Sequence, residues 1–150
     1  SGLQVGFTNY LGSGSGVVLG FLNLGIGDLV GLQIGLLNLA HWETFRVGQE
    51  GIYEVWQVNR YASTFRGLQA SAWNRGHAVH GLQLTGLVNE VWGELRGAQV
   101  GPVNVAGQVR GLQIGLVNVA RDLRGVQIGA INVAVRGGAL PVLPVLNVGL

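Results

Sequence analysis

The chain has 150 residues, a formal net charge of +2 and no Cys, and only 11% of its residues are charged, against about 25% in an average protein. Its length is that of one domain. The lack of Cys excludes disulfides and thiolate metal sites, and the small net charge does not indicate nucleic acid as a partner. Mean hydropathy is high, at +0.40, yet no segment approaches the roughly 20 consecutive apolar residues of a membrane helix.

Asparagine recurs ten times in one local setting, at spacings of 14 or 15 residues with a single gap of 21. The clearest unit reads Gly-Leu-Gln-Ile-Gly-Leu-Val-Asn-Val-Ala from Gly111 to Ala120, and a close copy runs from Gly125 to Ala134. A short fixed period is typical of a repeat architecture. The ten residues are Asn9, Asn23, Asn38, Asn59, Asn74, Asn89, Asn104, Asn118, Asn132 and Asn147.

The pattern between these positions predicts strands, because the segments are too short and too rich in Gly for helices and are dominated by Val, Ile and Leu. One unit repeats with the same turn signal each time, which favours parallel stacking. We therefore expect an all-β fold, a β-solenoid of about ten short coils of 14–15 residues, about 48 Å long at about 4.8 Å per coil. Stacked Asn and Gln amides would hydrogen-bond along the rod as ladders. A small antiparallel β-barrel is the alternative.

In chain order, we expect a single repeat domain over residues 1–150. Regular coils are predicted at 1–40 and 97–134. Irregular coils are predicted at 41–96, where an insertion begins at His41 and the Trp and His residues gather. The segment 137–150 is predicted to cap the stack, because its two Pro residues remove backbone donors and blunt a sheet edge.

The surface of such a thin solenoid is predicted to be partly apolar. Alternation along Leu112 to Ala120 leaves neither face of the strand clearly polar. Contiguous exposed apolar surface usually marks an interface. We therefore expect self-association, docking on another protein, or membrane contact.

A line of basic residues precedes the Gly that opens successive units. Stacking in register would place these side chains on one edge, about 5 Å apart, as a strip for an anionic partner such as an acidic glycan or phospholipid headgroups. The alternative is a solvated turn whose charge is partly neutralised by Glu94 and Asp122. The members of this predicted anionic-partner edge are Arg66, His80, Arg96, Arg110, Arg124 and Arg136.

A second candidate site is a cluster of polar and aromatic residues that follow the Asn positions of the irregular units. Trp and Tyr beside Arg and Glu are typical of sugar-binding or protein-binding surfaces. Burial of the aromatic rings in an oligomer interface is the alternative. The predicted ligand-binding residues are Trp42, Arg60, Tyr61, Arg75, His77, Glu90 and Trp92.

Catalytic, metal and cofactor sites are not predicted. Glu90 and Glu94 are a close pair of acids in the irregular region, and two carboxylates four residues apart are a nonspecific signal. No nucleophile–His–acid set stands out. His77 and His80 lack a third metal ligand at a matching spacing.

The units Gly111 to Ala120 and Gly125 to Ala134 resemble bacterial surface-repeat proteins best known from Leptospira, which carry Gly-(Leu/Val)-Gln-Ile-Gly-Leu-(Ile/Val)-Asn strings. The resemblance implies a secreted or outer-surface location and no catalytic residues. We expect a non-enzymatic structural or interaction module, self-associating or docking through apolar faces. Two other functions stay open, a transmembrane β-barrel of an outer membrane and a glycan-binding or glycan-acting β-solenoid that uses the central coils.

Overall fold

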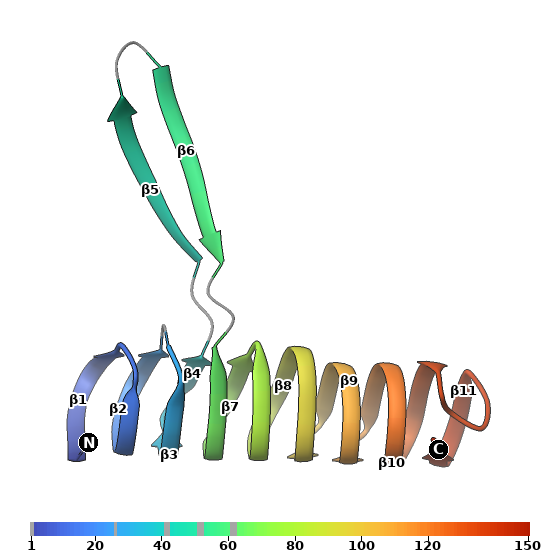
Figure 1. The fold of residues 1–150 in the computed structure, drawn as a ribbon. Helices are drawn as coiled ribbons and strands as arrows, with labels where there is room; N and C mark the ends of the chain where they lie inside the picture. The colour runs from blue at the N-terminus through green and yellow to red at the C-terminus, as the bar shows by residue number, and fades with distance from the viewer. Residues whose placement is uncertain (1, 26, 41–42, 51–52, 61–62) are drawn as a thin grey trace.

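A computed structural model of residues 1–150 describes the chain except for residues 1, 26, 41–42, 51–52 and 61–62, and describes the side chains outside 40–62. The chain is 86% strand and winds into a β-solenoid of about seven turns (Figure 1). At about 4.8 Å per turn the stack is about 34 Å long. The predicted solenoid is confirmed.

The coils are built from strands that pair in parallel with the strand one turn away. The longest strands follow the chain around a bend, so that one strand serves more than one coil. In chain order the coil strands are β1 (Gly2–Leu11), β2 (Gly14–Gly25), β3 (Leu29–Ile34), β4 (Leu37–Ala40), β7 (Thr64–Gly76), β8 (Ala78–Val100), β9 (Val103–Ile114) and β10 (Val117–Arg136). Since these pairings are parallel, the antiparallel alternative is wrong.

A column of glycines marks the same bend in every coil. Eight of them have φ between 134° and 159°, a backbone conformation that L side chains rarely adopt. A Cβ on Gly111 would lie 2.0 Å from the carbonyl oxygen of Gly97, one coil earlier. Glycine therefore opens each unit because the bend needs both its positive φ and close backbone approach. The column is Gly2, Gly16, Gly31, Gly67, Gly81, Gly97, Gly111 and Gly125.

Two ladders of buried amides fill much of the interior. In the first, the Nδ2 of each Asn donates to the Oδ1 of the next Asn at 2.8–3.1 Å, from Asn9 to Asn132. In the second, the Nε2 of each Gln donates to the Oε1 of the preceding Gln at 2.7–2.9 Å, from Gln127 back to Gln33. The two chains of hydrogen bonds run in opposite directions along the rod, so their amide dipoles oppose each other.

Apolar residues occupy the rest of the interior in two further columns. One holds a large side chain and contains Leu29, Phe65, Val79, Leu95, Val109 and Leu123. The other contains Val91, Ala106, Ala120 and Ala134. Amides are therefore as prominent in this core as hydrocarbon side chains, and every rung repeats the same four inward positions.

Two predicted ladder residues and the predicted coil count are corrected by the structure. The unit around Asn59 is not a coil but an antiparallel hairpin of β5 (Glu43–Glu50) and β6 (Tyr53–Arg60), in which Asn59 pairs with Thr44. Asn147 lies in β11 (Val142–Val148), which runs antiparallel to β10 and places Asn147 opposite Gln127 instead of on the Asn column. One of the ten expected units is a hairpin and another is a cap, which leaves the eight units that the Gly column marks, and these units wind through about seven turns.

The hairpin projects from the side of the stack without disturbing it (Figure 1). Strand β3 pairs directly with β7, so that Gly31 lies over Gly67 and Gln33 over Gln69. Within residues 64–96 the coils keep the common register, apart from shifts between Ser71 and Trp73 and between Val91 and Glu94. The irregularity of the central region is therefore mostly the hairpin.

The two ends of the stack differ. At the C-terminal end, β11 covers β10, and Gly149 exchanges two backbone hydrogen bonds with Gly125, at 3.0 and 2.8 Å. Asn147 donates to the carbonyl of Leu140 at 3.0 Å and accepts from the N–H of Ala139 at 3.1 Å. This amide therefore closes the turn of the cap.

A hollow of about 280 Å³ lies at the N-terminal end, and it reaches from Gly2 down to Phe65. Gly14 stands where most later coils place a large buried side chain, and Val18 stands where they place Gln. The Nε2 of Gln33 consequently finds no hydrogen-bond partner within the described chain. The Gln ladder stops here because its next acceptor is missing.

Asn118→Ala tests the Asn ladder. Asn118 is fully buried, accepts from Asn104 at 2.8 Å and donates to Asn132 at 2.8 Å and to the carbonyl of Ile128 at 2.9 Å. Its removal leaves these groups unsatisfied, so we expect a loss of about 1–3 kcal/mol in the free energy of unfolding. Urea titration measures it, with Gln108→Ala as the matched control because that amide is exposed. Equal stability of the two variants would contradict a ladder that stabilises the fold.

Val18→Gln tests the interruption of the Gln ladder. A carboxamide at this position gives Gln33 an acceptor and lies next to Gln4 in the first coil. We expect unfolding to become harder by about 1 kcal/mol, the net contribution of a typical hydrogen bond. Val18→Leu is the control, because it adds volume to the hollow without an acceptor. A gain with Leu that equals the gain with Gln would show that volume alone matters.

Candidate interaction surfaces

The outer surface of the rod carries long rows of exposed apolar side chains. One row contains the fourth residue of a unit, as Ile114 is in the unit that begins at Gly111. The next row lies at the bend two or three residues later, where Leu116 and Leu87 stand. Leu116 and Leu87 are 65% and 61% exposed, and Phe7 and Phe21 stack with ring centroids 4.8 Å apart. We call this surface the apolar edge; its exposed members are Val5, Phe7, Phe21, Ile34, Leu36, Trp73, Leu84, Leu87, Ile114, Leu116, Ile128 and Ile131.

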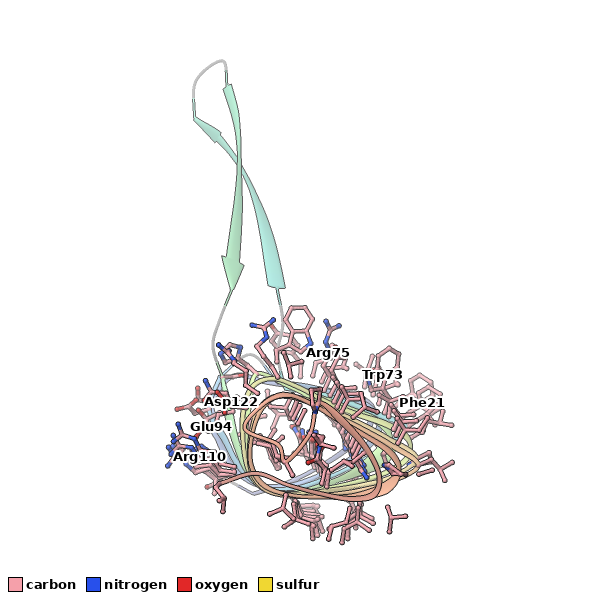
Figure 2. All side chains as sticks on the ribbon, turned by 90° about the vertical axis from the view of Figure 1, so that its right-hand side faces the viewer. Phe21, Trp73, Arg75, Glu94, Arg110 and Asp122 are labelled. Atoms are coloured by element: carbon pink, nitrogen blue, oxygen red, sulfur yellow. The ribbon has the colours of Figure 1, made fainter. Side chains whose placement is uncertain are left out.

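Charged side chains gather on the opposite side of the coil. Seen along the rod, Glu94, Arg110 and Asp122 lie on one side, and Phe21 and Trp73 on the other (Figure 2). The expected exposed apolar surface is therefore present, and the charges leave it uninterrupted. The rod has a hydrocarbon side and a charged side.

The predicted basic line is only partly a column. Arg66 lies over His80, and Arg96, Arg110 and Arg124 stack in register. Arg136 does not join them, because a Cβ on Gly137 would meet the backbone of Leu123, which is two residues before Gly125 of the Gly column. The chain has left the coil path at this point to form the cap.

Glu94 neutralises part of this line, as the sequence suggested. Its two carboxylate oxygens bridge two coils, at 3.0 Å from the Nε of Arg96 and 2.9 Å from the Nε of Arg110. The hydrogen bond from Arg96, then the charges of Arg96, Arg110 and His80, lower the pKa of the Glu94 carboxyl below 4.5 against the opposing effect of burial. The ionised form of the Glu94 side chain is therefore favoured between the guanidinium groups of Arg96 and Arg110.

Glu94→Gln tests this bridge by its pH dependence. Because the pKa of Glu94 is lower in the folded state, its contribution to stability is complete above its unfolded value and is lost as the pH falls below 4.5 through the folded value. We expect the variant to lose less stability than the parent between pH 6 and pH 3, as measured by urea unfolding at each pH. Parallel stability curves for the two proteins would rule out a stabilising bridge.

The predicted ligand-binding cluster is brought together only in part. Trp42 and Tyr61 lie outside the described residues, as does the side chain of Arg60. Arg75, Glu90 and Trp92 meet on one side of the coil, with the Arg75 Cζ 4.4 Å from the centre of the Trp92 ring. The backbone carbonyl of His77 accepts from the N–H of Gly93 at 2.7 Å.

Glu90 completes this cluster. One carboxylate oxygen accepts from the indole N–H of Trp92 at 2.7 Å, and the other lies 3.4 Å from the Nε of Arg75. Each of the three side chains contacts the other two. Trp92 is nevertheless 47% exposed, so that a large aromatic ring is held in a defined position at the surface.

A groove of about 480 Å³ adjoins this cluster. Its lining includes Trp92, Gly107 and Arg121, which follow Val91, Ala106 and Ala120 in one column of the stack. Sequence reasoning missed Gly107 and Arg121. The signal was a Gly in a position where the flanking coils carry large side chains. The complete lining is Glu90, Val91, Trp92, Val105, Ala106, Gly107, Val119, Arg121 and Val135.

The chain matches no protein family model, no curated protein and no solved structure. No helix of the described residues is long and apolar enough to cross a membrane.

Proposed function

We propose that this chain is a non-enzymatic interaction rod that associates with a second copy of itself through the apolar edge. The observation that carries the proposal is the exposed apolar rows, which run beside a core filled with amides. Soluble monomers rarely expose contiguous apolar patches of this kind, and patches of this kind mark interfaces.

The periodicity of the edge favours a second copy over an unrelated partner. Its rows repeat at the spacing of the coils, about 4.8 Å. A second rod of the same chain presents rows of the same spacing, so the side chains of the two copies can interdigitate along the whole length, as in dry interfaces between paired sheets. A two-fold axis would bring the same edge of both copies together.

Electrostatics is compatible with this pairing. The cations of the charged side lie across the coil from Phe21 and Trp73 (Figure 2). Two copies that meet at the apolar edge keep these like charges apart and in water, where they cost little. A secreted or outer-surface setting in a bacterium remains part of the proposal, on the resemblance of the repeat units.

Leu116→Arg tests the proposed association. The side chain is 65% exposed in the single chain, so the fold tolerates the change, whereas burying an unpaired guanidinium between two copies is unfavourable. We expect at least a roughly 10-fold rise in the dissociation constant, equivalent to about 1.4 kcal/mol, by analytical ultracentrifugation over a concentration series.

The control is Gln108→Arg, which adds the same charge at an exposed position between Glu94 and Asp122 in the register of the charged side. It should associate like the parent. A parent that stays monomeric at all concentrations, or equal weakening by both substitutions, would refute self-association through the apolar edge.

A further inference from the structure

The groove beside Trp92 has the features of a small ligand site and lies away from the apolar edge. Its volume of about 480 Å³ falls within the range of about 300–1,000 Å³ typical of ligand pockets. Its lining is mostly apolar, with Val105, Val119 and Val135 beside a few polar groups. Sites for small molecules combine these two properties.

Gly107 lines the groove without a side chain of its own. Gly107 stands between Trp92 and Arg121 in the stack, and a Cβ on Gly107 would lie 2.4 Å from the backbone oxygen of Trp92. The coils of Trp92 and Arg121 are two steps apart, about 9.6 Å. A planar ring in van der Waals contact on both sides, at about 3.5–4.0 Å each, needs about 7–8 Å. The gap therefore admits one ring.

The two walls of the gap are chemically different. On one side stands the indole of Trp92, held by Arg75 and Glu90 through the cation–π contact, the hydrogen bond and the ion pair. On the other stands Arg121, which is exposed and makes no ion pair with any residue that the structure describes. An indole favours an aromatic ring, and an unpaired guanidinium favours a carboxylate.

We propose that this groove binds an aromatic ring that carries a carboxylate, with the ring above Gly107 against Trp92 and the carboxylate on Arg121. Glu90 is occupied by Trp92 and Arg75 and holds the indole in place. The valines of the floor contact the ring edge. Such a group is found both as a free aromatic acid and as an aromatic side chain beside a carboxylate in a polypeptide.

Titration with N-acetyl-phenylalanine, followed through the indole N–H resonance of Trp92 by NMR, tests the site. We expect saturable binding, and at least 10-fold weaker binding of N-acetyl-phenylalanine amide, which lacks the carboxylate. Arg121→Gln should weaken binding of the acid by a similar factor. The matched control is Arg124→Gln, which removes an equal charge from a residue outside the groove and should bind like the parent.

Trp92→Leu should abolish binding of the acid, observed through ligand resonances, with thermal unfolding to show that the variant is folded. Acetyl-Glu-Phe-amide distinguishes the source of the ligand. If it binds as tightly as the free acid, the site fits polypeptide side chains; if only the free acid binds, it fits a small acid or a chain terminus. Both results support the proposed chemistry.

Three results would overturn it: no binding of either acid, equal binding of acid and amide, or stronger binding of glucuronate, a carboxylate on a saturated ring. The same titrations in Leu116→Arg make the outcome independent of self-association, because that substitution lies on the apolar edge and not in the groove.

Discussion

The structure depends on one interaction, the hydrogen bond from one carboxamide to an identical carboxamide one coil away. A carboxamide is its own partner, because it carries both a donor and an acceptor. When copies are related by translation along the rod, each amide satisfies its neighbours and is satisfied by them. This is why Asn and Gln can be fully buried in a core so thin, and why the strands must be parallel and in register. Chains of such bonds also polarise one another, which strengthens each member.

Because amides occupy much of the core, many large apolar side chains lie on the outside of the molecule. Hydrocarbon side chains that a globular domain would bury are placed on the surface here, because the interior has room for only four inward positions per coil. Amides and hydrocarbon side chains thus share the centre of the coil, while its circumference is apolar over much of its extent and charged along one side. The proposed association of the apolar edge and the proposed ligand binding in the groove of Trp92 are separate uses of that surface. They lie on different sides of the same rung and rely on different chemistry.

The architecture was predictable because its cause is local and repeated. The spacing of Gly, Gln and Asn predicts the bend, the amide ladders and the parallel stacking, and the structure has all three. Asn59 and Asn147 were misassigned because a residue in the right local setting was assumed to lie on the column. Whether the chain completes a coil around it depends on pairing with distant strands. Arg75, Glu90 and Trp92 were foreseen as a group, since register brings them together. The groove was not foreseen, because Gly107 lines it without a side chain, and such a position is recognised only when the residues of the neighbouring coils are placed around it.

The hairpin of β5 and β6 has a consequence for how such a rod can change. Asn38 donates to Asn74 at 3.1 Å across 36 residues of sequence, in the same geometry that elsewhere spans 14 or 15. The hydrogen bond between two stacked Asn side chains therefore does not depend on the length of chain between them. It requires only that the chain returns to the same bend of the next coil. A segment of any length whose ends lie close together can be inserted between two coils without altering the pitch. The solenoid can therefore accept an inserted segment at a bend between two coils while the strand pairing of the stack is retained.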